Sequence, residues 1–205
     1  MGLSAAAIKQ GLDAVAAIQP GFASALERAG YPEPRIRPTG YGTLLRTIVG
    51  QQVSVAAAAS MWRKFEGHIG EDLALDRVLE SSFDELRACG LSRQKQGYIR
   101  SLCELVTAGE LDFDALPADD EEAIAQLTRI KGIGRWSAEI YLLFAEGRPD
   151  IWPAGDLAVQ AGLHKLLDLE ERPSEKLTRE MAEAWRPYRG ATAIFTWHCY
   201  NNPAL

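Results

Sequence analysis

Helix start and stop signals recur along almost the whole chain. Ser54 precedes an alanine-rich run, Val55 to Ile69, that carries Met and aromatic side chains at helical spacing and ends at Gly70. Ser82 and Glu85 have the spacing of a capping box, in which each side chain binds the other residue's backbone N–H. No stretch of useful length alternates apolar and polar residues as a half-buried strand does. The pattern therefore predicts an all-α fold of about ten short helices.

Further helices are expected where a capping residue or a glycine opens an apolar run of helical period. These runs are Ser92 to Gly109, Asp119 onwards, Gly134 to Glu146, Asp156 to Leu167, Ser174 to Trp185 and Tyr188 to Cys199. A loop rich in glycine and proline, residues 30–40, separates an N-terminal helical pair from the rest. Trp62 and Trp185 lie among aliphatic residues at helical spacing, so we expect both in the core.

Composition is that of an ordinary globular protein. The chain has 205 residues, of which 47% are hydrophobic and 24% charged, enough for a sizeable core. No apolar stretch approaches the roughly 18 residues that cross a bilayer, and the N-terminus lacks the pattern of a secretory signal. Cys89, Cys103 and Cys199 lie far apart, without the spacing of a zinc or iron–sulfur site. We therefore expect an intracellular protein that does not bind membranes.

Charge is unevenly distributed along the chain. The net charge of −6 taken alone argues against a nucleic-acid partner. Residues 86–100, however, hold four bases and no acid, whereas residues 109–122 hold seven acids and no base. A polyanion such as a nucleic acid responds to a local patch of positive charge and not to the net charge of the protein. Nucleic acid therefore remains a candidate partner.

Two glycines one residue apart, Gly132 and Gly134, separate two expected helices. Glycine allows a tight turn and the close approach of another backbone. The turn leads directly into a helix N-terminus, whose first amides have no partner inside the helix and can bind phosphate. Lys131 and Arg135 add positive charge on either side. A plain helical corner closed by glycine is the alternative, and the basic flanks favour phosphate.

The stretch Leu127 to Ala138, LTRIKGIGRWSA, resembles the hairpin of the helix-hairpin-helix DNA glycosylase superfamily. That family has an aspartate further along the chain, and here Trp152 to Gln160, WPAGDLAVQ, contains Asp156. Leu44 to Ser54 and Leu91 to Lys95 are similar to two other recurrent segments of the family. The likeness extends from about Tyr41 to Tyr200 and is nearest to the 3-methyladenine DNA glycosylase II branch, which has tryptophan in the hairpin and Ala-Gly-Asp or Asp-Asp before the next helix.

The resemblance implies one glycosylase unit, residues 1–205, made of two helical lobes with a cleft between them. One lobe is expected at roughly 43–150 and the other at roughly 1–42 plus 151–205. Longer family members carry an N-terminal β-rich domain, for which we expect no room in 205 residues. We expect a monomer.

The function implied by the resemblance is base excision repair. The enzyme would flip alkylated purines such as 3-methyladenine or 7-methylguanine out of double-stranded DNA and hydrolyse the N-glycosyl bond. Two alternatives remain: a sibling glycosylase for hypoxanthine, uracil or an oxidised purine, and a helical DNA-binding module without catalysis. The expected location is the cytoplasm and nucleoid, or the nucleus.

Asp156 is the expected catalytic residue, because a carboxylate can stabilise the oxocarbenium-like sugar or position water. It also stands where a good helix N-cap would, and the two roles can coexist. Asp150 is the alternative carboxylate. Bifunctional members of the family carry a Schiff-base lysine directly after the hairpin arginine, where this chain has Trp136. We therefore expect a monofunctional enzyme that leaves an abasic site and has no lyase activity.

Aromatic faces would attract a cationic alkylated base. Trp136 and Trp197 match pocket positions of the family and Tyr41 is a further candidate, with core packing as the alternative for each. The expected DNA contacts are Gly132, Gly134, Lys131, Arg135, Gln51, Gln52, Val53, Arg93 and Lys95. Among these, Gln52 or Val53 would fill the gap left by the flipped base, and Gln51 could instead be a hydrogen-bonding residue at a helix end.

No cofactor is expected to be required. The resemblance suggests a structural monovalent or divalent cation, held by the main-chain carbonyls of Thr128, Ile130 and Ile133. The acidic run, residues 109–122, is expected to be a solvated face turned away from DNA. His68 and His164 are expected in solvent, and His198 lies next to Trp197 in the sequence.

Overall fold

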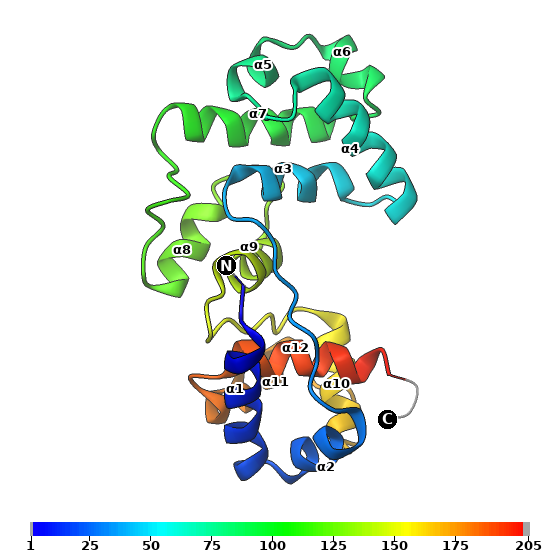
Figure 1. Ribbon diagram of the computed structural model, residues 1–205, viewed down its shortest axis with the longest axis vertical. Coiled ribbons are helices and arrows are strands. Elements are labelled where there is room, and N and C mark those ends of the chain that lie inside the picture. The colour runs from blue at the N-terminus through cyan, green and yellow to red at the C-terminus, as the bar shows by residue number, and fades with distance from the viewer. Residues whose placement is uncertain (1, 203–205) are drawn as a thin grey trace. The chain divides into compact units, whose positions relative to one another are not determined.

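All regular structure in the described residues, 2–202, of this computed structural model is helical, and these residues contain no strand (Figure 1). The all-α prediction is thus confirmed. The α-helices are α1 (Ala5–Ile18), α2 (Pro20–Ala29), α3 (Tyr41–Gly50), α4 (Val55–Ile69), α5 (Leu75–Glu80), α6 (Phe83–Ala88), α7 (Arg93–Thr107), α8 (Asp120–Leu127), α9 (Arg135–Tyr141), α10 (Leu157–Leu166), α11 (Glu175–Ala182) and α12 (Arg189–Tyr200). A π-helical turn, η1 (Leu142–Glu146), and a 3₁₀ turn, η2 (Glu183–Trp185), complete the set.

The helices begin where the sequence signals predict. Ser54 accepts a hydrogen bond from the Ala57 amide at the start of α4. Ser82 and Glu85 form both halves of the capping box of α6. Because each cap satisfies an amide that the helix leaves unpaired, these starts are local properties of the sequence.

Two helices that were not expected, α3 and α5, bring the number above ten. α3 follows Gly40 and α5 follows Ala74, neither of which has a polar side chain that could cap a helix. The run expected as one helix to Glu146 is instead α9 followed by the π-helical η1. These elements depend on tertiary packing more than on caps.

The chain divides into two compact units. Unit 1 comprises Met1–Arg37 and Glu139–Leu205, and unit 2 comprises Pro38–Ala138. The second boundary therefore falls within α9, earlier than the expected position near residue 150. The reason is that η1 packs with unit 1: the Phe144 ring lies 5.6 Å from the Trp197 ring.

Aromatic packing forms the core of unit 1. The Trp185 ring lies 5.2 Å from the Phe22 ring and 5.4 Å from the Trp152 ring. α10 and α12 approach closely at Gly162, where a Cβ would lie 2.5 Å from Thr196 Cγ2. Trp185 is 2% exposed, which confirms its predicted place in the core.

The core of unit 2 is built around α3, α4 and α7. Trp62 is 7% exposed and its ring lies 5.8 Å from that of Phe65, so the prediction for Trp62 is also confirmed. Ile48 and Leu86 are fully buried in the same unit.

Cysteines Cys89, Cys103 and Cys199 are all buried. Burial raises the pKa of Cys103 and of Cys199 to about 12, which leaves both thiols protonated and unreactive at neutral pH. No helix within residues 2–202 has the length and apolarity to cross a membrane.

Thr178 on α11 offers a test of the packing in unit 1. Its hydroxyl is fully buried and has no hydrogen-bond partner within residues 2–202. Thr178→Val should therefore raise the free energy of unfolding by about 1 kcal/mol, because a methyl group replaces an unsatisfied buried hydroxyl of the same shape. Denaturant unfolding measures the change, and a loss of stability would show that the hydroxyl has a partner in solution.

Candidate active site and nucleic-acid interface

Asp156 is held at the start of α10 by three hydrogen bonds to a single carboxylate oxygen. Oδ1 accepts from the backbone amides of Ala158 at 2.8 Å and Val159 at 3.0 Å, so Asp156 is the N-cap of the helix. The same oxygen accepts from the indole Nε1–H of Trp197, on α12, at 3.1 Å. Asp156 itself is half-buried. The structure thus bears out the capping alternative and adds an aromatic partner that fixes the carboxylate.

The loop before Asp156 is anchored to α10 and α11. Trp152 donates its indole N–H to the Thr178 carbonyl of α11 at 3.1 Å. Gln160, 6% exposed, donates its side-chain amide to the Ala154 carbonyl at 2.9 Å. Sequence reasoning missed Gln160, because a buried amide in an apolar helix has no distinguishing pattern. Both contacts restrict the backbone that presents Asp156.

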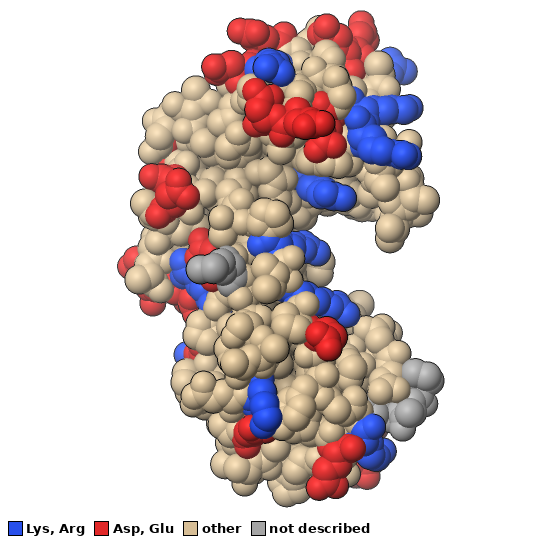
Figure 2. All heavy atoms as spheres, viewed as in Figure 1, with Lys and Arg blue, Asp and Glu red and all other residues tan. Residues whose placement is uncertain are grey.

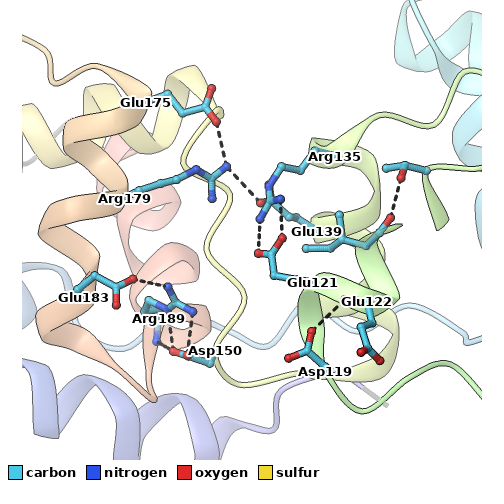
Figure 3. Close-up of polar contacts among 12 residues, drawn as sticks. Asp119, Glu121, Glu122, Arg135, Glu139, Asp150, Glu175, Arg179, Glu183 and Arg189 are labelled. Carbon is cyan, nitrogen blue, oxygen red and sulfur yellow. Dashed lines mark hydrogen bonds and ion pairs between the residues drawn. The ribbon is translucent and has the colours of Figure 1, made fainter. Parts of the chain in front are cut away.

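An ion-pair chain on the surface of α11 approaches the same loop (Figure 3). Arg179 contacts Glu175 at 2.9 Å and the nearly buried Glu139 at 3.5 Å. Glu175 in turn lies against the loop, since a Cβ on Gly155 would be 3.4 Å from its Oε2. None of these charged residues was a candidate from the sequence.

Trp197 is almost completely packed. It is 8% exposed, and its ring lies 5.6 Å from that of Phe144 in η1. Arg37 lies over the other aromatic ring of this pair, with its guanidinium carbon 5.8 Å from the Phe144 centroid. In the structure, Trp197 thus has a buried ring and donates a hydrogen bond to Asp156.

The glycine hairpin of unit 2 uses its two glycines differently. Gly132 has φ +81°, and a Cβ there would lie 2.1 Å from Cδ2 of Tyr98 on α7. Gly134 has no atom within 4 Å of a Cβ among the residues that the structure describes. Gly132 is thus required by the fold, whereas Gly134 leaves open space in front of the turn. Ile130 and Ile133 are buried beside the turn and anchor the hairpin.

Both hairpin arginines are paired with the acidic run. Arg135 makes two contacts with the Glu121 carboxylate, at 2.7 and 2.5 Å (Figure 3), and Arg129 pairs with Glu110. Glu121 therefore lies beside Arg135, one of the expected DNA contacts, while the expectation that the run faces away from DNA stays a prediction. Glu121 belongs to α8, the helix before the glycine turn, and Arg135 begins α9, the helix after it, so the turn brings the two side chains together. Lys131 remains exposed.

Comparison with known proteins assigns the chain to a protein superfamily. Residues 45–187 match the model of the HhH-GPD superfamily of base excision DNA repair proteins. The chain belongs to this superfamily. The predicted superfamily is thereby confirmed, and the matched range includes the hairpin and Asp156.

Individual relatives agree with the superfamily match. DNA-3-methyladenine glycosylase 1 of Schizosaccharomyces pombe is 32% identical over 161 residues, which cover 77% of this chain and 71% of that protein. The structure of a Bacillus halodurans DNA-3-methyladenine glycosidase is similar with a TM-score of 0.87 at 31% identity, covering 94% of this chain and 89% of the other. The S. pombe 3-methyladenine DNA glycosylase in complex with abasic DNA is similar with a TM-score of 0.82 at 26% identity, covering 96% and 98%.

The turn that joins α3 to α4 lies against the hairpin in this HhH-GPD chain. Gln51 donates its side-chain amide to the Gly132 carbonyl at 2.9 Å. Gln52 has φ +54°, a conformation that residues other than glycine rarely adopt, and Val53 is 38% exposed. Of the three candidates here, Gln51 is a hydrogen-bonding residue next to a helix end, while Gln52 and Val53 stand at the exposed tip.

Lys95 is placed differently from the other expected DNA contacts. It is 9% exposed, and its Nζ donates to the Val49 carbonyl at 2.7 Å. Burial lowers the pKa of Lys95. The structure thus gives Lys95 a contact that holds the end of α3, and its expected contact with DNA stays a prediction. The sequence of a helix does not show whether a lysine side chain such as that of Lys95 points into solvent or into the core.

The remaining candidates are exposed or half-buried. Trp136, the second residue of α9, is 45% exposed, and Tyr41 is half-buried with its hydroxyl donating to the Leu73 carbonyl at 3.3 Å. Arg93 is exposed and lies over the Phe83 ring at 5.7 Å. On the face shown in Figure 2, several Lys and Arg side chains lie together at the right of the upper part, whereas acidic and basic side chains are mixed at the top.

Asp150, the alternative catalytic carboxylate, forms ion pairs with two arginines. It contacts Arg186 at 2.6 Å and Arg189 at 2.8 Å, and its side chain is 16% exposed. His198 binds the Ala29 carbonyl at 3.1 Å, and His68 binds Ser81 Oγ at 3.0 Å. Within residues 2–202, no group of three His, Cys, Asp or Glu side chains is placed to hold a metal ion.

Proposed function

We propose that this HhH-GPD protein is a monofunctional DNA-3-methyladenine glycosylase of the glycosylase II type. It excises alkylated purines such as 3-methyladenine and 7-methylguanine from double-stranded DNA by hydrolysis and leaves an abasic site. The observation that carries the proposal is the Asp156 carboxylate, held through Oδ1 by two α10 amides and the Trp197 indole. The names of its relatives, among them DNA-3-methyladenine glycosylase 2 of Escherichia coli at 26% identity, support the substrate class.

In the proposed reaction, Asp156 stabilises the positive charge that develops on the sugar as the glycosidic bond breaks. A carboxylate fixed before the reaction does this without reorganisation, which is the main advantage of a preorganised site. An alkylated purine carries its own positive charge and leaves without a strong general acid, so one carboxylate suffices. Trp136, where bifunctional enzymes have their nucleophile, has no amine to form a Schiff base, which supports the absence of lyase activity.

Unit 2 would supply the contacts to the DNA backbone. The hairpin amides ahead of α9 and the exposed Lys131 suit a phosphate, because the helix N-terminus carries partial positive charge. The exposed indole of Trp136 suits stacking on a cationic base. The damaged base would be flipped out of the duplex before it reaches Asp156. We propose that the protein acts as a monomer on genomic DNA, and hence inside the cell.

The carbonyl oxygens of Thr128, Ile130 and Ile133 are the proposed ligands of a structural cation at the hairpin. The Ile130 carbonyl already accepts the Ile133 amide at 3.0 Å, but a carbonyl oxygen has a second lone pair. An all-oxygen set fits a hard monovalent or divalent cation. When bound, the cation would stabilise the turn; the chemistry at Asp156 needs no cofactor.

The proposed function is tested by incubating the protein with methylated duplex DNA at a stated low salt concentration. Release of free 3-methyladenine or 7-methylguanine with the strand intact is the expected result. Cleavage of the DNA strand in the absence of added alkali would overturn the monofunctional assignment. Binding of the duplex without release would overturn the alkylated-purine assignment.

Glu121→Gln is predicted to strengthen binding of undamaged duplex DNA. The substitution removes a carboxylate that pairs with Arg135 and so lowers the competition with phosphate for the guanidinium. Since both side chains are largely exposed, the gain should be modest, about two- to fivefold in Kd at low salt. Glu122→Gln is the matched control, because it changes the net charge equally on the next residue of α8. Equal effects of the two substitutions would mean that only net charge matters.

A further inference from the structure

The turn between α3 and α4 is held from its α3 side by a buried charge. Val49 belongs to the last turn of α3, where carbonyls have no amide partner further along the helix. The Lys95 ammonium, on α7, donates to the Val49 carbonyl at 2.7 Å. Lys95 is 9% exposed, so its charge is removed from water to make this contact. Burial of a charge is costly and indicates that the contact fixes the end of α3 firmly.

A second contact, made by the C-cap residue of α3, ties the turn to the hairpin. Gln51 donates to the Gly132 carbonyl at 2.9 Å, directly at the glycine whose φ is +81°. α7 supports this hairpin as well: Tyr98 occupies the space in front of Gly132, and Ser101 Oγ accepts the Lys131 amide at 3.2 Å. One helix therefore holds both the turn and the hairpin.

Gln52 directly follows these two contacts in the chain and has a left-handed conformation. Its φ of +54° is a backbone state that side chains disfavour, and such states persist where the surrounding structure enforces them. The Lys95 and Gln51 contacts hold the backbone before Gln52, and the Ser54 cap of α4 holds the backbone after it. Gln52 and the 38% exposed Val53 are consequently presented at a fixed distance from the hairpin.

We propose that Lys95 and Gln51 are positioning residues, which hold the exposed tip of the α3–α4 turn in register with the phosphate-binding hairpin. The inference rests on the proposed function, in which the hairpin binds the DNA backbone; Gln52 or Val53, at the exposed tip, would then fill the space left by the flipped base. Insertion of a side chain between bases requires a wedge of fixed position relative to the backbone contacts. Lys95 contributes to DNA binding through the turn and makes no phosphate contact.

The first part of the test needs no DNA. Amide hydrogen exchange of residues 50–54 is measured in the free protein for Lys95→Met, Gln51→Leu and the control Arg93→Met, which removes an exposed charge from the same helix. Lys95→Met and Gln51→Leu should each accelerate exchange in this turn by about tenfold, while the control leaves it unchanged. Unchanged exchange in both anchor variants would overturn the inference. Gln51 is half-buried, so its variant serves if Lys95→Met does not fold.

The second part measures binding to duplexes with and without an abasic-site analogue as a function of salt. We expect Lys95→Met to keep the wild-type salt dependence and to lose about tenfold in preference for the abasic duplex. A salt slope reduced by about 1, with both duplexes weakened equally, would identify Lys95 as a phosphate contact and refute its positioning role. Failure of the wild type to release any base would count against the proposed function alone, because the exchange and binding measurements involve no chemistry.

Discussion

Asp156→Asn is expected to reduce the single-turnover rate of base release by on the order of 10² to 10⁴. Asparagine retains a side-chain oxygen that can cap α10 and accept the Trp197 indole, so the substitution removes the charge and leaves the geometry. Because Asp156 is the N-cap, asparagine should also leave the free energy of unfolding nearly unchanged. Quantifying free base from methylated duplex, together with duplex affinity, tests the prediction.

Asp156→Ala separates capping from catalysis. Alanine loses the cap as well as the charge, which should cost about 1 kcal/mol of stability, with a further cost for the buried Trp197 N–H. Both variants should bind duplex DNA close to the wild-type affinity. If Asp156→Asn released base at the wild-type rate, Asp156 would be a helix cap and nothing more, and the proposed mechanism would fail.

Gly132→Ala is expected to destabilise the protein by about 2–5 kcal/mol, or roughly 5–20 °C in Tm. Two causes add: a side chain at φ +81° is strained, and the Cβ would lie 2.1 Å from the Tyr98 ring. The clash is with a ring anchored on α7, and so it cannot be relieved cheaply. Thermal and denaturant unfolding measure the loss.

Gly134→Ala is the matched control within the same hairpin. A Cβ there meets no atom within 4 Å in residues 2–202, so stability should stay within about 0.5 kcal/mol of wild type. Because the added methyl projects into the space proposed for phosphate, duplex affinity should fall about tenfold. Unaltered DNA binding in this variant would argue that phosphate does not approach the turn at Gly134.

Local signals in the sequence determined the helical architecture. Serine caps fix the starts of α4, α6 and α7, because each satisfies amides within its own first turn. The glycine turn of the hairpin was equally evident, since a turn of this kind needs glycine at Gly132. The superfamily followed from these residues in their order along the chain.

Contacts between distant segments were decided only by the tertiary structure. Arg135 and Lys95 are both cations beside recurrent segments, yet Arg135 pairs with Glu121 on α8, and Lys95 is buried against the end of α3. Trp197 donates to Asp156 across 41 positions of sequence, a separation at which no local pattern can specify a hydrogen bond. Propensities and caps act within one turn of helix and are visible in the sequence, whereas the partner of a charge or an indole depends on which helices the core brings together.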